Sequence, residues 1–574
     1  MNIKKYITTV IKYGFSVLLM IRLFISFPSK KILLMSLVEL GIIALATNVI
    51  MKPKPAKARR ICGRIFNTVA FLLLNAQLLI MFFSRTFLMM VMLTNTDSMA
   101  SISGQAVRYA IGVILVVAAS ILPVEYISLK KEKGISGEEA ESEAESDKNL
   151  DETVDDIEGR TKVWSYRFLT ILLAFELLLV FVFGFGESPI FAYGLLAKEK
   201  MDIVKRQNAA KQSENINVTT EFYKDCVYDG IERPEELGEN PNIVYIMTEG
   251  FSKNIIDDSR DVMPNMRKLS ENGISFEKYY NHTFATYRGI IGQLYSGYQE
   301  GNDDENTLVS IMDVLEKRGY HTICINVEPE NEIFSDYLGR LGFDEVRTGK
   351  PDKSGNARSL SDGKAYKLLH EVIKEESEKD APYFIVMYTF GTHVSFNSKE
   401  EKYGDGSVAF YNKFYNADYQ FGTFFDEWSE SKYADNTLLV MTGDHGTYGD
   451  EGYADAFPEY NATRYTAVMD EMPFILWHKG IKPQVIDARG RNSLSAIPTV
   501  LDYVDISEPN YFLGETLFYN YGSYYDTIFQ EEGFLYGSAN GKLTSLVDSE
   551  AAEAWNYIYM YYNAKKQTPM VPEE

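Results

Sequence analysis

Apolar runs in the first third of the chain constrain its fold more than any other feature. Five of them approach the roughly 20 residues that a helix needs to cross the hydrocarbon core of a bilayer. They cover about residues 8–27, 32–50, 65–83, 108–127 and 168–185. Further runs follow the first one too closely for it to be only a cleaved signal peptide. We therefore expect residues 1–190 to form a membrane domain of five transmembrane helices.

Basic residues in the short loops predict the orientation of these helices. The densest cluster lies between the second and third runs and contains Lys52, Lys54, Lys57, Arg59 and Arg60. Because such clusters stay in the cytoplasm, we expect the N-terminus to be cytoplasmic as well. Five spans then place everything after the last run outside the cell. An acidic low-complexity tract, residues 132–158, interrupts the next inside loop and is expected to be solvated and disordered.

Charged residues also occur inside the apolar runs, at Lys12, Arg22 and Glu176. Charges at such positions usually pair with one another or face a polar cavity. Lys12 and Arg22 lie near span ends, where snorkelling of the long side chain to the interface is the alternative. Glu176 lies deeper in its run, which favours pairing there.

The rest of the chain has the size of a large enzyme domain. A net charge of −23 argues against nucleic acid as a partner. Residues 191–239 are polar and have no apolar stripe, so we interpret them as a linker. Residues 240–574 are enough for one large α/β domain. Cys226 and Cys324 lie after the spans and could form one disulfide, although nothing in their flanks requires it.

Strand and helix patterns alternate through this second part. β-branched apolar runs begin near Asn242, His321, Tyr383, Thr437 and Pro473. Helical patterns lie among them at about 263–272, 308–318, 364–376 and 412–428. This alternation predicts βαβ crossovers and a mostly parallel sheet. Near the C-terminus, the turn residues 538–541 lie between apolar segments and predict a small antiparallel addition.

Two of the predicted strands stop at residues that bind metals. The run TLLVMTGDHG ends at Asp444, His445 and Gly446, and the run that begins at Asn242 ends at Glu249. Ligands collect at the carboxyl ends of strands in open α/β sheets, and carboxylate with imidazole suits Mn²⁺ or Zn²⁺. Taken alone, Asp444 to Gly446 is equally compatible with a simple turn after a strand.

Several motifs resemble a known superfamily when they are taken in order. NIVYIMTEG, the turn Thr286-Tyr287-Arg288-Gly289, TFGTH, MTGDHG and SAIPTVLDYVDI are similar to the successive landmarks of alkaline phosphatases and sulfatases. Five spans followed by an outer domain resemble the lipoteichoic acid synthase and phosphoglycerol transferase family within it. The resemblance covers essentially the whole chain and implies an alkaline-phosphatase-like α/β fold for residues 240–574.

This resemblance implies a specific reaction and site. Family members use one divalent metal ion, Mn²⁺ above all, with Zn²⁺ or Mg²⁺ as alternatives. They move glycerol phosphate from phosphatidylglycerol to a glycolipid or polymer through a covalent intermediate on a threonine. By position, Glu249, Thr286, Asp444 and His445 match the family's metal ligands, with Thr286 also the nucleophile and His393 a phosphate-binding residue. The implied location is the bacterial cell membrane, with the catalytic domain outside.

The chemistry of the residues is compatible with these roles. A threonine hydroxyl is a poor nucleophile at neutral pH, so Thr286 needs a neighbouring base or a metal that lowers its pKa. Arg288, two residues on, offers a planar fork of donors for phosphoryl oxygens. The alternative is that Arg288 only pairs with an acid. His393 could bind phosphate or protonate a leaving alkoxide.

Two departures from the family patterns leave other functions open. Sulfatases carry Cys or Ser in a C/S-x-P-x-R turn, whereas this chain has Thr286-Tyr287-Arg288, which speaks against sulfate esters. Ahead of Leu341-Gly342-Phe343-Asp344, the synthases usually place an Arg that contacts substrate, but Phe334 stands about there in this chain. The alternatives are therefore another acceptor, a phosphodiesterase or sulfatase-like hydrolase, or a catalytically silent relative that binds the envelope. The intact ligand set speaks against the silent relative.

Overall fold

A computed structural model describes the chain in two compact units. One unit contains Met1–Met89 and Ala106–Lys198, and the other contains Met90–Gln105 and Glu199–Glu574. The described residues are 3–51, 57–84, 86–94, 106–125, 166–211, 222–226, 233–299, 308–351, 359–394, 396–519, 525–531, 534–538, 542–546 and 548–565.

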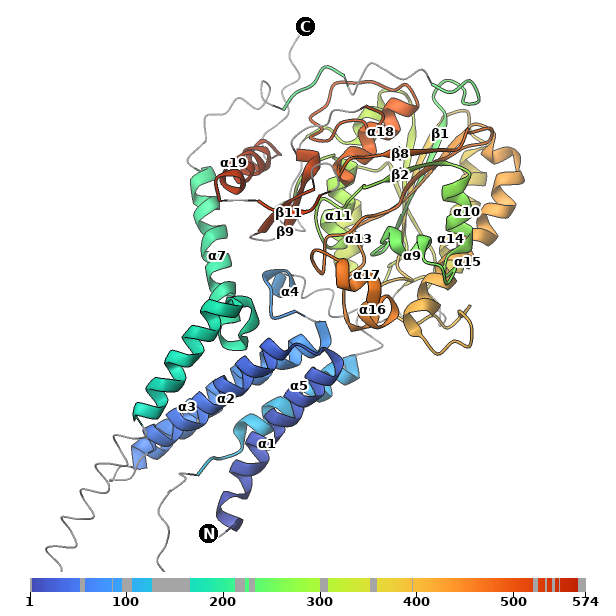
Figure 1. The fold of residues 1–574 in the computed structure, drawn as a ribbon. Helices are drawn as coiled ribbons and strands as arrows, with labels where there is room; N and C mark the ends of the chain where they lie inside the picture. Colours follow the sequence, from blue (N-terminus) through green and yellow to red (C-terminus); the bar gives the residue numbers. More distant parts are fainter. Residues whose placement is uncertain are drawn as a thin grey trace, which may run out of the picture. The chain divides into compact units, whose positions relative to one another are not determined.

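The first unit is built from apolar helices. Its helices include α1 (Ile3–Ser26), α2 (Lys30–Ile50), α3 (Lys57–Ser84), α5 (Ala106–Ile121) and the segment Tyr166–Phe183 (Figure 1). Side chains such as Phe181, 88% exposed, and Val10, 68% exposed, point away from the unit. An apolar outer surface of this kind is what lipid contact requires.

The fourth of the five predicted spans corresponds to a shorter helix than expected. Among the described residues, four helices are long and apolar enough to cross a membrane, and α5 is a shorter apolar helix of 16 residues. The expected span 108–127 ends early because Pro123 lacks a backbone N–H and disfavours helix in the residue before it. At 1.5 Å per residue α5 is about 24 Å long, a few ångströms short of the hydrocarbon core.

The second unit contains an eight-stranded sheet in the order β4-β3-β5-β1-β6-β7-β2-β8. Its strands are β1 (Asn242–Thr248), β2 (Ile274–Glu277), β3 (His321–Asn326), β4 (Glu345–Thr348), β5 (Tyr383–Thr389), β6 (Thr437–Gly443), β7 (Phe474–Trp477) and β8 (Gln484–Asp487). Only β7 runs antiparallel to its neighbours, so the predicted mostly parallel sheet is confirmed. Every residue of β5 and β6 is buried, as in a sheet that is covered on both faces.

Helices cover this sheet and connect its strands. They include α9 (Lys253–Asp257), α10 (Pro264–Glu271), α11 (Thr286–Leu294), α12 (Ile311–Glu316), α13 (Glu332–Gly339), α14 (Asp362–Glu376), α15 (Ala409–Glu430), α16 (Glu451–Ala456), α17 (Pro458–Thr463) and α18 (Ala496–Tyr503). Local signals start several of them, because Ser310 and Asp313 form a capping box on α12 and Ser361 caps α14. The four predicted helical segments correspond to α10, α12, α14 and α15.

The C-terminal part adds a small antiparallel sheet, as predicted. Strands β9 (Ile528–Glu531), β10 (Phe534–Gly537) and β11 (Thr544–Ser545) pair in the order β11-β10-β9, and helix α19 (Asp548–Lys565) follows. The predicted turn begins at Ser538, directly after β10, and its residues 539–541 lie outside the described residues.

The predicted linker begins as a helix. Helix α7 (Pro189–Lys211) contains its first residues, and residues 212–221 and 227–232 lie outside the described ranges. Cys226 is an exposed free thiol and Cys324 a buried one on β3, so the structure joins no disulfide between them.

Candidate metal centre

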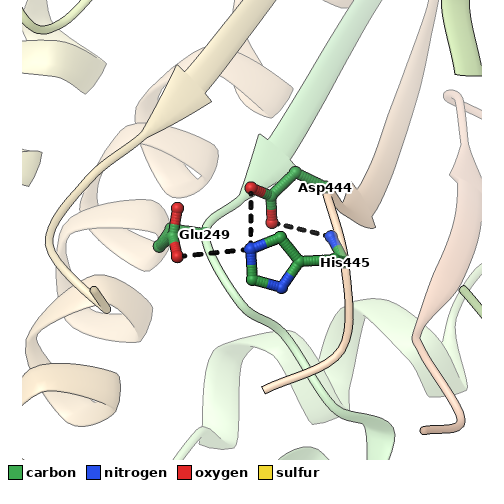
Figure 2. Close-up of side chains that lie close together, drawn as sticks. All are labelled: Glu249, Asp444 and His445. Carbon is green, nitrogen blue, oxygen red and sulfur yellow. Dashed lines mark hydrogen bonds and ion pairs between the residues drawn. The ribbon is translucent and has the colours of Figure 1, made fainter. Parts of the chain in front are cut away.

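Three side chains with metal-binding groups converge at the carboxyl end of the sheet. Glu249 directly follows β1, and Asp444 and His445 directly follow β6 (Figure 2). The two strands pair in parallel with Thr248 opposite Gly443, so their next residues leave the sheet at the same level. All three side chains are buried, and their ligand atoms lie within 4.8 Å of one another.

Hydrogen bonds aim the free lone pairs of these groups at one another. His445 Nδ1 donates to the Gly446 carbonyl at 2.8 Å, which leaves the Nε2 lone pair facing Glu249 Oε1 and Asp444 Oδ2, each at 3.5 Å (Figure 2). Asp444 Oδ1 accepts from the backbone N–H groups of Gly250 and His445 at 2.8 and 2.7 Å. Asp444 Oδ2 is buried and has no hydrogen-bond partner within the described parts of the chain.

The two carboxylates of this cluster favour a bound cation. Burial disfavours the charged imidazolium, but Asp444 and Glu249 outweigh burial and raise the pKa of His445 to about 9. Burial, together with the charge of Glu249, raises the pKa of Asp444 to about 7. Burial alone would also raise the pKa of Glu249, but His445 holds it well below its usual range. The cluster therefore holds a proton when it has no other cation, and two carboxylates with one imidazole fit a divalent ion in that place.

Thr286 lies next to this cluster as the first residue of α11. Its hydroxyl donates to Glu249 Oε2 at 2.9 Å. The preceding residue, Ala285, has φ of 80° and ψ of 144°, a conformation that costs a non-glycine residue about 1–3 kcal/mol. Strain of this size persists where the surrounding structure fixes the backbone. Here the Ala285 conformation accompanies a Thr286 hydroxyl that points at the cluster.

Close packing fixes α11 against the tip of β6. A Cβ atom on Gly289 would lie 2.2 Å from the Asp444 carbonyl oxygen, so only glycine permits this approach. Gln293 Nε2 donates to the carbonyls of Gly443 and Asp444 at 2.9 and 3.2 Å. These contacts hold the predicted nucleophile and the predicted ligands in one rigid arrangement.

Two residues that the sequence analysis missed support Glu249. Tyr388, on β5, donates to Glu249 Oε2 at 2.5 Å, and Thr392 Oγ1 donates to the Glu249 carbonyl at 2.6 Å. Tyr388 lies opposite Met247 of β1 in the parallel register, which brings its hydroxyl to the strand tip. Its position in an apolar strand gave no sign of this contact.

His393 lies near the cluster, after the end of β5. Its ring stacks on Phe390 with centroids 4.8 Å apart, and its Nδ1–H donates to the Val394 carbonyl at 3.0 Å. Burial lowers the pKa of His393 overall, although the charge of Glu249 acts to raise it. His393 is therefore neutral at pH 7, with a lone pair on Nε2.

Arg288 is buried on the first turn of α11. It lies two residues from Thr286, and its role in substrate binding stays a prediction.

A pocket beside the cluster contains two further charged residues. Glu249, His445, Lys413 and Asp450 are among its lining residues. Lys413 comes from α15 and Asp450 caps α16. Lys413 lies on the apolar face of a predicted helix, and a lysine at such a position is the signal that could have identified it.

Comparison with known proteins gives a family match for the part of the chain that contains the cluster. Residues 241–506 match the Sulfatase family model. Enzymes of that family use a divalent metal, which is consistent with the carboxylate and imidazole cluster.

The relatives include proteins of lipoteichoic acid synthesis. Lipoteichoic acid synthase 2 of Bacillus subtilis (strain 168) is 20% identical over 309 residues, which are 48% of this chain and 46% of that protein. The chain thus spans about half the length of this curated relative.

Two solved structures are among the other matches. A protein of the alkaline phosphatase superfamily from Vibrio parahaemolyticus has a TM-score of 0.48 and 17% sequence identity. The match covers 63% of this chain and 95% of that protein's chain. The lipoteichoic acid synthase LtaP from Listeria monocytogenes has a TM-score of 0.45 and 16% sequence identity. This match covers 57% of the present chain and 92% of the LtaP chain.

Proposed function

We propose that this protein is a membrane-bound phosphoglycerol transferase. It takes glycerol phosphate from phosphatidylglycerol, releases diacylglycerol, and passes the glycerol phosphate to a glycolipid or polymer of the cell envelope. Glu249, Thr286, Asp444 and His445 hold one divalent ion, with Mn²⁺ the first candidate and Zn²⁺ or Mg²⁺ the alternatives. The observation that carries the proposal is the hydrogen bond from the Thr286 hydroxyl to Glu249 inside the buried cluster.

The two oxygens of the Glu249 carboxylate have separate surroundings. Oε1 faces His445 Nε2, whereas Oε2 accepts from the hydroxyls of Thr286 and Tyr388. Oε2 is thus placed to take the proton of Thr286 while Oε1 serves as a ligand. A bound divalent ion would offset charge on the phosphoryl oxygens and lower the pKa of the Thr286 hydroxyl.

In the first half-reaction, Thr286 Oγ1 attacks the phosphorus of the lipid headgroup. The bond from phosphorus to the diacylglycerol oxygen breaks, that oxygen takes up a proton from water, and glycerol phosphate stays on Thr286 as a phosphodiester. In the second half-reaction, a hydroxyl of the acceptor attacks the same phosphorus, and Thr286 leaves and takes back the proton that Glu249 Oε2 accepted. His393 Nε2, which has a free lone pair in the neutral imidazole, accepts the proton of that hydroxyl.

Labelled substrates test this reaction. The full chain in detergent with Mn²⁺ is incubated with phosphatidylglycerol, phosphatidylethanolamine or an aryl sulfate ester. We expect diacylglycerol release from phosphatidylglycerol alone, and labelled headgroup trapped on a peptide that contains Thr286. Free glycerol phosphate in the absence of any acceptor would instead identify a hydrolase. A preference for the sulfate ester would contradict the proposal.

Variants of two threonines in the same region sharpen the test. Thr286→Ala should reduce turnover by several orders of magnitude, because covalent catalysis loses its nucleophile, and Thr286→Ser should restore part of it. Thr283→Ala is the matched control, since the Thr283 hydroxyl donates to the Gln530 carbonyl instead of a cluster residue. Undiminished turnover in Thr286→Ala would exclude the covalent route.

The proposal also requires the α/β domain to lie outside the cytoplasmic membrane. The exposed thiols Cys62 and Cys226 are first replaced by Ser. Single cysteines at position 213 or 142 are then treated with a membrane-impermeant maleimide in intact cells. We expect labelling at 213 and none at 142, and the reverse pattern would overturn the orientation.

A further inference from the structure

Lys413 is a buried cation beside the candidate metal centre. It lies on the first turns of α15 and is 3% exposed, which is rare for a lysine that lacks an ion-pair partner. Its ammonium donates to the His393 carbonyl at 3.2 Å and lies 4.4 and 5.3 Å from the centroids of the Phe410 and Phe414 rings. Only one of these contacts is a hydrogen bond to oxygen, whereas an ammonium has three donors.

Two carboxylates lie near Lys413 but beyond ion-pair distance. The charges of Asp450 and Glu249 act on the ammonium, yet among the described residues none has a carboxylate oxygen within 4.0 Å of it. Asp450 accepts from the Tyr453 backbone N–H at 2.8 Å as the cap of α16. Glu249 accepts from Thr286 and Tyr388. These carboxylates offset part of the cost of burying the ammonium, and a bound anion in direct contact with it would offset more.

Lys413 lines the same pocket as two of the candidate metal ligands. Glu249, His445, Thr392 and Lys413 are among the residues of this pocket. An anion bound there would have both the metal centre and the ammonium among its neighbours. A phosphoryl group suits two such points, because it has at least two non-bridging oxygens that point in different directions.

We propose that Lys413 binds a non-bridging oxygen of the phosphoryl group held at the metal centre, so that the pocket is a two-point anion site. The ligand class is a phosphate ester or free phosphate. The identity of the natural anion rests on the proposed function, whereas the role of Lys413 rests on its own contacts. Burial lowers the pKa of Lys413 to about 8, so the ammonium still carries its charge at pH 7.

Calorimetry on the full chain in detergent with saturating Mn²⁺ tests the proposal. Inorganic phosphate is titrated in one arm and a short-chain phosphatidylglycerol in the other, the latter on a Thr286→Ala background to prevent turnover. Lys413→Met should weaken the binding of at least one probe by about 10- to 100-fold, the usual value of a hydrogen bond to a charged group. Loss for the lipid alone assigns the site to the headgroup, and loss for both assigns it to the phosphoryl group.

Controls separate this role from folding and metal binding. Lys367→Met removes an exposed lysine of α14 and should change neither titration. Mn²⁺ affinity should stay within about threefold in Lys413→Met, because the lysine is not a ligand. Should that variant fail to fold, Lys413→Gln keeps a donor for the His393 carbonyl without the charge. Wild-type affinity for both probes in either folded variant would overturn the inference.

The binding test of Lys413 can succeed or fail whether or not the protein cleaves phosphatidylglycerol. Phosphate binding that needs Lys413, in a protein that does not cleave phosphatidylglycerol, would refute the proposed function and support the anion site. Cleavage of phosphatidylglycerol with unchanged binding in the Lys413 variants would do the opposite.

Discussion

Lys12 in the membrane unit and Lys413 in the α/β unit are both buried, but their surroundings differ. The Lys12 ammonium donates to the carbonyls of Ser120 and Leu122 at 2.7 and 3.2 Å and lies 4.9 Å from the Phe71 ring. These carbonyls are at the C-terminal end of α5, where a helix leaves oxygens without internal partners and carries partial negative charge. The Lys413 ammonium has one carbonyl partner and two ring neighbours, Phe410 and Phe414, and the residue lines a pocket.

The comparison shows how a structural charge differs from a functional one. Lys12 donates to carbonyl oxygens at the end of α5, so its charge stabilises the packing of α1 against α5. The three cluster residues Glu249, Asp444 and His445 bring their ligand atoms close together, Asp444 Oδ2 has no hydrogen-bond partner among the described residues, and Lys413 lines the adjoining pocket. Buried polar groups in native proteins are rarely left in this state, and a ligand is the usual explanation.

Removing a ligand of the cluster should have the largest effect. Asp444→Ala or His445→Ala should lower bound metal from about one ion per chain to near zero and reduce turnover by several orders of magnitude. Elemental analysis of the purified full chain and turnover of phosphatidylglycerol measure the two effects.

Asp418→Asn is the control for that experiment. Asp418 is a buried acid whose oxygens accept from the backbone of Asn265 and Met266. Its replacement should lower the free energy of unfolding by about 1–3 kcal/mol and leave the metal content unchanged. Equal metal in wild type and in both ligand variants would place the metal site elsewhere.

The pH dependence of anion binding should show an intermediate effect. Burial lowers the pKa of Lys413 to about 8, while its charged neighbours Asp450 and Glu249 act in the opposite direction. The charge is therefore present below pH 8 and is lost as the pH rises through that value. An arginine keeps its charge throughout this range.

Inorganic phosphate titrated into wild type and Lys413→Arg measures this effect. Between pH 7 and pH 9, the affinity of wild type should fall by about tenfold relative to that of Lys413→Arg. The ratio removes changes that both proteins share, such as the ionisation of phosphate and of His393. A constant ratio would show that Lys413 does not carry the charge that binds phosphate.

Lys12→Met should have the smallest effect on function. It leaves the Ser120 and Leu122 carbonyls without their donor, so we expect the free energy of unfolding to fall by about 1–3 kcal/mol. Thermal melts in detergent measure this loss, while phosphate affinity and turnover per folded molecule should not change. Weaker phosphate binding in this variant would remove the distinction between the two lysines.

Much of the fold and the main cluster follow from the sequence itself. The runs that became β1, β5 and β6 are long, apolar and β-branched, and they end abruptly at polar residues, so both strands and strand tips are recognisable. Glu249, Asp444 and His445 come together because parallel strands in one sheet end at the same edge. Strands β2, β4 and β8 escaped prediction because each has four residues that mix polar and apolar side chains, whereas β7, of the same length, is apolar throughout.

Other features were decided only by the tertiary structure. The parallel register places the Tyr388 hydroxyl on Glu249, and no local pattern encodes a pairing of residues 139 positions apart. Lys413 was hidden in the same way, since a helix pattern gives the face of a residue but not what that face meets. Helix periodicity, strand alternation and turn chemistry are local and can be recognised in the sequence. The meeting of α15 with the strand tips of β1 and β6 depends on long crossovers and on packing over the whole sheet, and only the folded chain fixes it.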